Sequence, residues 1–310
     1  HNPAPDNGYK VYLGGSVVQG DGRGVQIVPP FDAEIAAAIE AAPPADEVPM
    51  NDDLIEAVDP REEYVACASA LASGDASARE NLCIVLTAMH GVGAEITSRV
   101  LAEAGFTNVS LVAAQADPDP DFPTVPFPNP EEAGALDMAI EQAREQGADL
   151  IIAVDPDADR CALAVPDPAS ETGWSPLSGD QIGSLLGEFL ASRGMKGSLA
   201  NSIVSSRLLS RIARAHGLEH HTTLTGFKWI ARAPGLGFGY EEAIGFCPDP
   251  AHVRDKDGIA TSVVAASLVA SLKAQGRSVW DELERLARLH GLHVSRSEEH
   301  TSELQSHSEI

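Results

Sequence analysis

The feature that most restricts the fold is the run Asp155 to Arg160, which reads Asp-Pro-Asp-Ala-Asp-Arg and lies between two apolar segments. Residues 150–154 before it read Leu-Ile-Ile-Ala-Val, and residues 161–165 after it read Cys-Ala-Leu-Ala-Val. Short, continuous apolar runs are typical of strands that are buried on both faces. The sequence therefore predicts two neighbouring buried strands that are joined by an acidic connection.

This connection is a candidate metal site. Alternate spacing lets the side chains of Asp155, Asp157 and Asp159 converge on one cation, and ligands that are all oxygen favour Mg²⁺ over Zn²⁺. A solvated acidic turn is the alternative, because the whole chain is acidic. An EF-hand also begins Asp-x-Asp-x-Asp, but it needs Gly and Glu where this chain has Arg160 and Pro166. The EF-hand is therefore excluded.

Further elements follow the order strand, loop, helix. A helix is predicted to begin at Pro130, with Asn129 as its N-cap, and to end before Gly147. Ser178 and Gln181 match a capping box at the start of another helix. The remaining expected elements are a strand over 82–86, a helix over 94–104, a helix to about residue 192, a strand over 199–204 and a helix over 205–216. This alternation indicates an α/β protein.

Two α/β units of similar size are predicted, over residues 59–175 and 176–294, and residues 1–58 are expected to be the edge of a third unit. The Pro-rich segment 166–176 is expected to mark the boundary, because it should neither extend a sheet nor bury much apolar surface.

The charge of the chain excludes several classes of partner. With 21 Lys and Arg against 46 Asp and Glu, the net charge is −25, which argues against sequence-independent binding to nucleic acid. The apolar stretch 258–272 is too short to span a membrane, so no membrane partner is expected. The four cysteines form no C-x-x-C motif, which favours reduced thiols in a cytoplasmic protein.

Three other loops carry polar chemistry. Residues 223–229 combine hydroxyls, a glycine, a lysine and an aromatic ring, which suits a sugar or sugar-phosphate site; an ordinary polar loop is the alternative. The adjacent carboxylates Glu241 and Glu242 can accept hydrogen bonds from neighbouring sugar hydroxyls, or they belong to a solvated turn. Residues 87–93 can hold an anion with backbone amides, or they form a plain turn with a hydrogen-bonded His90.

Taken together and in this order, the motifs resemble the α-D-phosphohexomutases, the phosphoglucomutase/phosphomannomutase family, over about the first 295 residues. The resemblance implies consecutive three-layer α/β/α domains with mixed sheets. Residues 1–58 would end domain I, 59–175 would form domain II with the metal loop, and 176–294 would form domain III with the sugar loops. The domain IV motif Arg-x-Ser-Gly-Thr-Glu does not occur in the 310 residues.

The resemblance also implies roles for single residues. The three aspartates Asp155, Asp157 and Asp159 would bind Mg²⁺, and Arg160 would lie beside the phosphoryl group. The implied substrate-binding residues are Thr225, Gly226, Lys228, Glu241, Glu242 and Lys256.

The first residues match the family's active-site motif, Thr-Ala/Gly-Ser-His-Asn-Pro followed by Asn-Gly-Tyr/Phe-Lys. His1 and Lys10 fall on motif positions, and Lys10 matches a position proposed as an acid/base. The phosphorylated Ser would precede His1, so no mutase turnover is expected of the 310-residue chain itself. Residues 296–310 resemble a translated sequencing adapter and are expected to be a non-native tail from about residue 295; a genuine polar tail is the alternative.

The implied activity is reversible phosphoryl transfer between the 1- and 6-positions of a hexose phosphate, glucose or mannose. It would pass through a phosphoserine and a bisphosphorylated sugar such as glucose 1,6-bisphosphate, with sugar phosphates as the partners. Three alternatives stay open: a non-catalytic module that binds sugar phosphate or Mg²⁺, a phosphopentose substrate, and a Mg²⁺-dependent phosphatase with an aspartate nucleophile.

Overall fold

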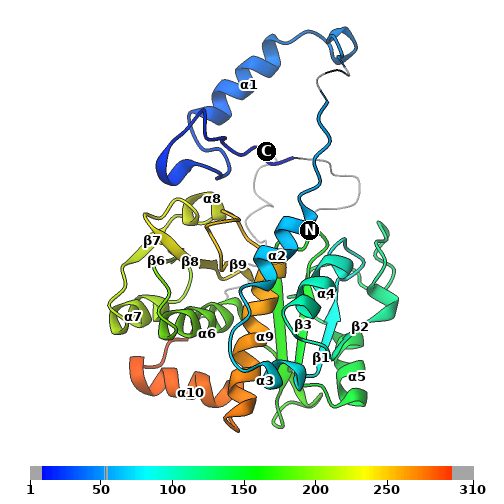
Figure 1. Cartoon of the computed structure of the whole chain (residues 1–310), viewed down its shortest axis with the longest axis vertical. Coiled ribbons are helices and arrows are strands. Elements are labelled where there is room, and N and C mark those ends of the chain that lie inside the picture. The colour runs from blue at the N-terminus through cyan, green and yellow to red at the C-terminus, as the bar shows by residue number, and fades with distance from the viewer. Residues whose placement is uncertain (1–8, 52, 54, 295–310) are drawn as a thin grey trace, which may run out of the picture.

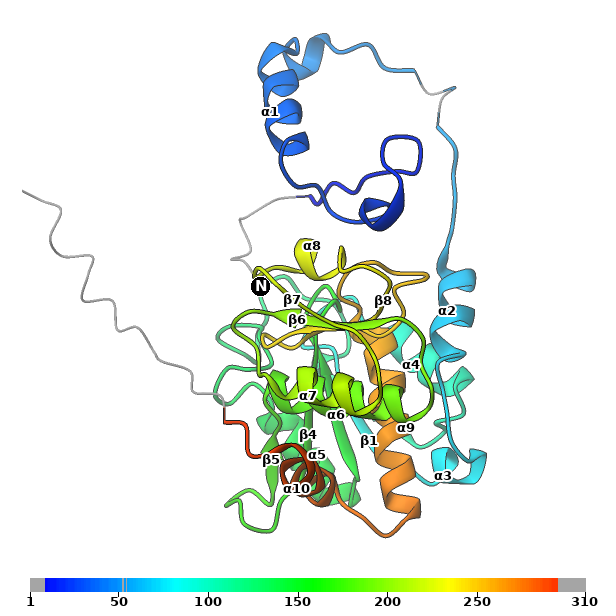
Figure 2. The ribbon, with the colours of Figure 1, turned by 90° about the vertical axis from the view of Figure 1, so that its left-hand side faces the viewer.

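The computed structural model describes residues 9–51, 53 and 55–294. In this part of the chain, two sheets with their covering helices lie next to each other, and the segment before α2 extends beyond the second sheet (Figures 1 and 2). The elements of this segment are η1 (Gly20–Gly22), α1 (Phe31–Ala41) and η2 (Ala45–Glu47).

The first sheet has the strand order β2-β1-β3-β4-β5. Its strands are β1 (Ile84–Thr87), β2 (Val109–Leu111), β3 (Leu150–Val154), β4 (Cys161–Pro166) and β5 (Trp174–Pro176). The strands β2, β1 and β3 are parallel, whereas β4 and β5 are antiparallel to their neighbours, so the sheet is mixed. All residues of β1 and β3 are buried. The prediction of two adjacent buried strands, β3 and β4, is confirmed.

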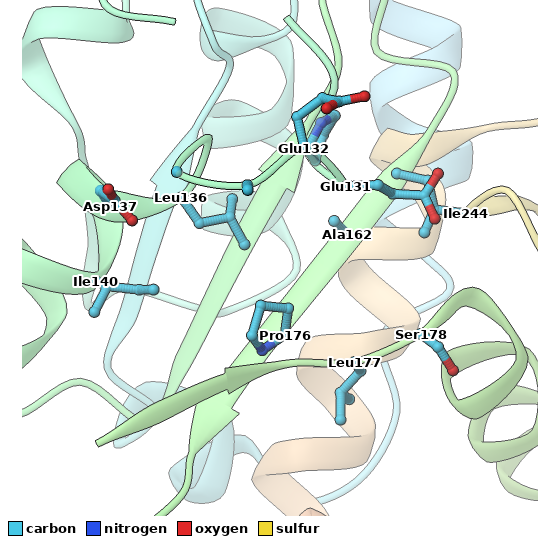
Figure 3. A pocket seen from close by; sticks show the side chains of 13 residues that line it. Glu131, Glu132, Leu136, Asp137, Ile140, Ala162, Pro176, Leu177, Ser178 and Ile244 are labelled. Carbon is cyan, nitrogen blue, oxygen red and sulfur yellow. The ribbon is translucent and has the colours of Figure 1, made fainter. Parts of the chain in front are cut away.

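Helices cover both faces of this sheet. The helices of this half are α2 (Arg61–Ser69), α3 (Ala76–Glu80), α4 (Ala94–Glu103) and α5 (Asp137–Gln146), with the 3-10 helix η4 (Ala113–Gln115). Helices α4 and α5 contact the strands, whereas α2 packs on α4. The helices α4 and α9 (Gly258–Ala274) pack against each other and against one face, while α5 lies on the other face (Figures 1 and 3). The three-layer α/β/α prediction is therefore confirmed.

The second sheet has the order β7-β6-β8-β9, with the last strand antiparallel. Its elements are α6 (Gly179–Ser192), β6 (Ser198–Ser202), α7 (Leu208–Ala215), β7 (His220–Thr223), α8 (Phe227–Ile230), β8 (Leu236–Glu241), β9 (Gly245–Cys247) and α10 (Val279–His290). Helices α6 and α7 cover one face and α8 lies over the other (Figure 1). The capping box of Ser178 and Gln181 opens α6 as predicted.

Helix α9 joins the two halves of the core. It contacts β3 and β4 of the first sheet and β9 of the second, and its N-cap Asp257 accepts a hydrogen bond from the backbone of Ala260 at 2.8 Å. No single helix in the described ranges is long and apolar enough to cross a membrane; α9 and α10, bent by 92° at their junction, meet the length and composition criteria only as a pair.

The helix predicted from Pro130 begins later than expected, at Asp137, with Leu136 as its N-cap. Asn129 does accept a hydrogen bond from the backbone of Glu131, at 3.1 Å, but it caps a turn, because Gly134 has a φ of +81° and interrupts the helical backbone. The predicted end is correct, since Gly147 closes the helix in the left-handed region.

The prediction that the segment 166–176 cannot extend a sheet is wrong. Strand β5 pairs antiparallel with β4, with Ser175 opposite Val165 and Pro176 opposite Ala164. Because β5 is the last strand in the order, one of its edges needs no backbone donor, and proline is tolerated there. Trp174 adds buried surface that the sequence pattern did not indicate.

Candidate functional site

The metal loop, residues 155–160, connects β3 to β4. Each of Asp155, Asp157 and Asp159 offers one carboxylate oxygen, and these oxygens all lie within 4.8 Å of one another. Asp155 is 1% exposed, whereas Asp157 is open to solvent. The predicted convergence of the three carboxylates is confirmed.

The electrostatics of this loop fit a bound cation. Burial, together with the two neighbouring carboxylates, raises the pKa of Asp155 to about 7, although the backbone N–H of Arg160 donates to its Oδ1 at 3.0 Å. Asp159 Oδ1 is buried and has no hydrogen-bond partner within the described residues. Oxygen-only ligands of this kind suit Mg²⁺ better than Zn²⁺.

Two lysines meet at Asp159. Its Oδ2 lies 3.0 Å from Lys10 Nζ and 3.2 Å from Lys256 Nζ. Burial alone would lower the pKa of Lys10, but the charge of Asp159 and the hydrogen bond to it outweigh burial and raise that pKa. Lys256 Nζ also lies 3.9 Å from Glu241 Oε1. Four residues from separate motifs thus form one chain of ion pairs, Lys10, Asp159, Lys256 and Glu241.

The segment that carries Lys10 is fixed to domain III at further points. The hydroxyl of Tyr12 donates to a carboxylate oxygen of Asp255, and Val25 packs into a buried cluster with Phe227 and Ile230. Sequence reasoning missed Tyr12. The available signal was its spacing of two residues from Lys10, because side chains two residues apart in an extended segment point to the same side.

The metal loop also contacts the turn after β8. Arg160 forms an isolated antiparallel bridge with Gly245, and the backbone N–H of Cys161 donates to the carbonyl of Ile244 at 3.1 Å. Glu241 is 7% exposed, and burial raises the pKa of this carboxyl despite the nearby Lys256. The turn that was predicted to bind a sugar therefore lies directly against the metal loop.

Glu242 points to a different set of partners. Its Oε2 accepts hydrogen bonds from the hydroxyls of Ser202 at 2.8 Å and Ser205 at 2.7 Å. Sequence reasoning missed both serines, because nothing in the pattern marks the end of β6 as a partner of the turn after β8. The two hydroxyls fix one oxygen of Glu242.

The loop of Thr225, Gly226 and Lys228 lies at the start of α8, where Gly226 is the N-cap. Lys228 Nζ is 5.9 Å from the ring centroid of Trp229. Among the residues that the structure describes, no hydrogen bond or ion pair joins this loop to the metal loop. His1, the other predicted catalytic residue, lies outside the described residues.

Residues 87–93 form a plain structural turn. His90 is 5% exposed, and its Nε2 forms a hydrogen bond with Thr124 Oγ1 at 2.8 Å. The backbone N–H of Val92 donates to the carbonyl of Pro156 at 2.9 Å. The hydrogen-bonded alternative for His90 is therefore correct, and the turn supports the metal loop.

A pocket of about 370 Å³ lies beside the site, between the start of α5 and the connection from β5 to α6 (Figure 3). Glu131 and Ile244 both line it (Figure 3). Burial raises the pKa of Glu131, although the charge of Arg160 acts in the opposite direction. Sequence reasoning placed Glu131 in a helical first turn and missed its position near the site.

The arrangement combines three chemical capacities. Clustered carboxylates can hold a hard cation, the ammonium groups of Lys10 and Lys256 can bind a phosphate, and the carboxylates of Glu241 and Glu242 can accept hydrogen bonds from hydroxyls. A phosphorylated polyol is the ligand class that uses all three.

Comparison with known proteins agrees with this geometry. Residues 62–169 match the family model "Phosphoglucomutase/phosphomannomutase, alpha/beta/alpha domain II". Residues 178–289 match the model of domain III of the same family. The two matches together cover more than half of the chain.

Similar curated proteins carry several names. The chain is 46% identical over 303 residues to a "Probable phosphomannomutase" of Haemophilus influenzae, covering 95% of this chain and 60% of the relative. It is 36% identical to the phosphoribomutase of Saccharomyces cerevisiae, covering 85% of this chain and 47% of the relative. It is 32% identical to the human phosphopentomutase, covering 96% and 51%.

Among solved structures, a "putative phosphomannomutase" from Thermus thermophilus superposes with a TM-score of 0.69 at 26% identity, covering 86% of this chain and 58% of that one. The chain thus spans 60% of the Haemophilus relative and about half of the yeast and human relatives.

Proposed function

Because the chain belongs to the phosphoglucomutase/phosphomannomutase family, we propose that it supplies the metal-binding and sugar-binding parts of a phosphosugar mutase. The reaction is reversible phosphoryl transfer between the 1- and 6-positions of a hexose phosphate, through a phosphoserine and a bisphosphorylated sugar. The observation that carries the proposal is the meeting of Asp159, Lys10 and Lys256 at the junction of the two sheets.

The metal loop is proposed to hold Mg²⁺ through Asp155, Asp157 and Asp159. When bound, Mg²⁺ neutralises charge on a transferring phosphoryl group. Arg160 supports this site in two ways, since its backbone N–H orients Asp155 and its guanidinium Nε lies 3.9 Å from Asp155 Oδ2. Its cationic side chain is suited to lie beside the phosphoryl group.

The remaining residues are proposed to bind and orient the sugar phosphate. Lys256 and Lys10 supply positive charge next to the metal loop, and Lys10 is the proposed acid/base, its raised pKa favouring the proton-donating form. Glu241 and Glu242 accept hydrogen bonds from sugar hydroxyls, and Glu242 is oriented by the two serine hydroxyls. The proposed contacts on the far side of the sugar come from Thr225, Gly226 and Lys228.

A pentose phosphate is the second candidate substrate. The yeast and human relatives named above are a phosphoribomutase and a phosphopentomutase. The partners are proposed to be small sugar phosphates in the cytoplasm, and the four cysteines, which are all free, agree with a reducing compartment.

Binding is the first measurement, because it tests the substrate class directly. Calorimetric titration with glucose 1-phosphate, mannose 1-phosphate and ribose 1-phosphate in Mg²⁺ gives the substrate class. We expect saturable binding of a hexose phosphate that Lys256→Met weakens by about 10-fold. Lys196→Met is the matched control and should change nothing.

Two outcomes would replace the proposal. If a longer chain with the serine restored binds glucose 1,6-bisphosphate but never interconverts glucose 1-phosphate and glucose 6-phosphate, the protein is a binding module. If the chain hydrolyses sugar phosphates and Asp155→Asn removes hydrolysis while metal binding persists, it is a phosphatase. Failure of all three sugar phosphates to bind would also refute the proposal.

A further inference from the structure

Helix α7 carries three arginines on one face. Arg207 is the N-cap residue, and Arg211 and Arg214 follow at spacings of four and three residues. At 3.6 residues per turn these positions lie on the same side of the helix. The opposite side, with Leu209 and Ile212, is fully buried in the core. The helix therefore presents a row of guanidinium groups to solvent.

The three arginines are exposed, and none of them has an ion pair with any described residue. Other arginines of the chain do have such partners; Arg99 and Arg288, for example, pair with glutamates 2.6 Å away. In a chain with 46 acidic and 21 basic residues, a basic side chain is expected to find a carboxylate nearby. The charge of this row is not neutralised locally.

The row lines a hollow of about 840 Å³, together with Ser210, His220 and His293. This size is within the range of about 300 to 1,000 Å³ that is usual for small-molecule sites. Burial lowers the pKa of His220, whose Nε2 forms a hydrogen bond with Asn201 Oδ1 at 3.0 Å. The positive charge of the hollow therefore comes from the arginines.

The hollow is separate from the metal loop. Helix α7 covers the face of the second sheet opposite to α8 (Figure 1), and none of the hollow's lining residues belongs to the metal loop, to the Glu241 turn or to the segment of Lys10. A ligand bound here would not occupy the proposed sugar-phosphate site.

We propose that this hollow binds a small molecule with two or more phosphoryl groups. Arginine forks bind phosphate oxygens in pairs, and seven residues of helix span about 10 Å, so the row can contact two phosphoryl groups at once. Nucleic acid is a poor candidate, because the net charge of −25 repels a long polyanion. A compact ligand interacts mainly with the local arginines and is less affected.

Inorganic pyrophosphate is the probe. Calorimetric titration of the 310-residue chain in EDTA at 50 mM NaCl should show saturable binding that weakens at 200 mM NaCl. Arg211→Ala should lower the affinity by about 10-fold, and Arg211→Glu should abolish binding. The matched control is Arg288→Ala, which removes an exposed arginine that is already paired with Glu284 on α10; its affinity should equal that of wild type.

Three results would overturn the proposal. The first is no saturable binding of pyrophosphate by the wild-type chain. The second is binding that survives Arg211→Glu but is lost in Lys256→Met, which would place the anion at the proposed sugar-phosphate site instead. The third is a change of oligomeric state in Arg211→Glu without pyrophosphate binding by wild type, which would make this face a contact for a second copy. The test does not depend on the mutase proposal.

Discussion

Replacing Gly91 by Ala tests whether the turn before α4 holds the metal loop in place. A Cβ atom at position 91 would lie 2.2 Å from Pro156 Cα and 2.4 Å from the carbonyl oxygen of Pro156. Ordinary van der Waals contact begins at 3.4 Å, so one of the two backbone segments would have to move by about 1 Å. Because Pro156 stands between Asp155 and Asp157, this movement displaces two of the proposed metal ligands.

The size of the effect follows from the atoms involved. Overpacking of a well-packed site usually costs about 1–3 kcal/mol, and we expect about 3 kcal/mol because both partners are backbone, which cannot rotate away. For a chain of 310 residues, with an unfolding entropy of about 2.1 cal/mol/K per residue, the Tm should fall by roughly 5 °C. Since metal sites tolerate ligand shifts of only about 0.2 Å, the Mg²⁺ affinity should fall by at least about 10-fold.

The assay is thermal unfolding followed by circular dichroism, with calorimetric titration of Mg²⁺ into the same samples. Gly14→Ala is the matched control, because a Cβ at position 14 meets nothing within 4 Å. If Gly91→Ala has the Tm and the Mg²⁺ affinity of wild type, or if Gly14→Ala is equally damaging, the reasoning about the turn is wrong.

Three further outcomes are expected. Ser205→Ala should weaken hexose-phosphate binding several-fold in calorimetry without lowering the Tm by more than about 2 °C, because it removes one of the two hydroxyls that hold Glu242 Oε2 and leaves the Ser202 hydroxyl in place; equal affinity would refute the role. Glu282 is buried, and burial alone would raise its pKa. Its hydrogen bonds, above all those from Arg285, nevertheless lower that pKa overall. The charged Glu282 carboxylate therefore stabilises the fold above about pH 4, and this stabilisation is lost as the pH falls through the pKa of the folded state. Glu282→Gln should therefore cost about 2 kcal/mol in urea unfolding at pH 7 and less at pH 3, and a cost independent of pH would contradict this. Asp75→Ala removes an N-cap that accepts from Ser77 at 2.8 Å and should cost about 1 kcal/mol, measured in the same way; no loss would mean that α3 does not need its cap.

The sequence predicted best those elements whose local signals agree. The apolar runs of β3 and β4, the capping box of Ser178 and the closure of α5 by Gly147 all lie where the pattern indicates. The start of α5 was misplaced because Asn129 caps a turn as well as it would cap a helix. Strand β5 was missed because the pattern does not show that a proline falls on an unpaired edge.

The same distinction applies to the site. The three aspartates were found because they are neighbours in sequence and converge within one loop. Tyr12, Ser202 and Ser205 were missed because their partners are far away in the chain, and only the packing of segment on segment brings them together. One sequence shows at most that two such side chains share a side of an extended segment, as Lys10 and Tyr12 do; it does not show which distant residue they contact.

The proposed function depends on the metal loop binding a single divalent cation through Asp155, Asp157 and Asp159. Calorimetric titration of Mg²⁺ into the wild-type chain and into Asp157→Asn tests this binding. The Asp157 side chain is exposed, so the substitution should leave the fold intact. Asp121→Asn, at another exposed aspartate, is the control. We expect one saturable site, weakened at least about 10-fold by Asp157→Asn and unchanged by Asp121→Asn. No saturable site in wild type, or equal affinities in wild type and Asp157→Asn, would contradict it.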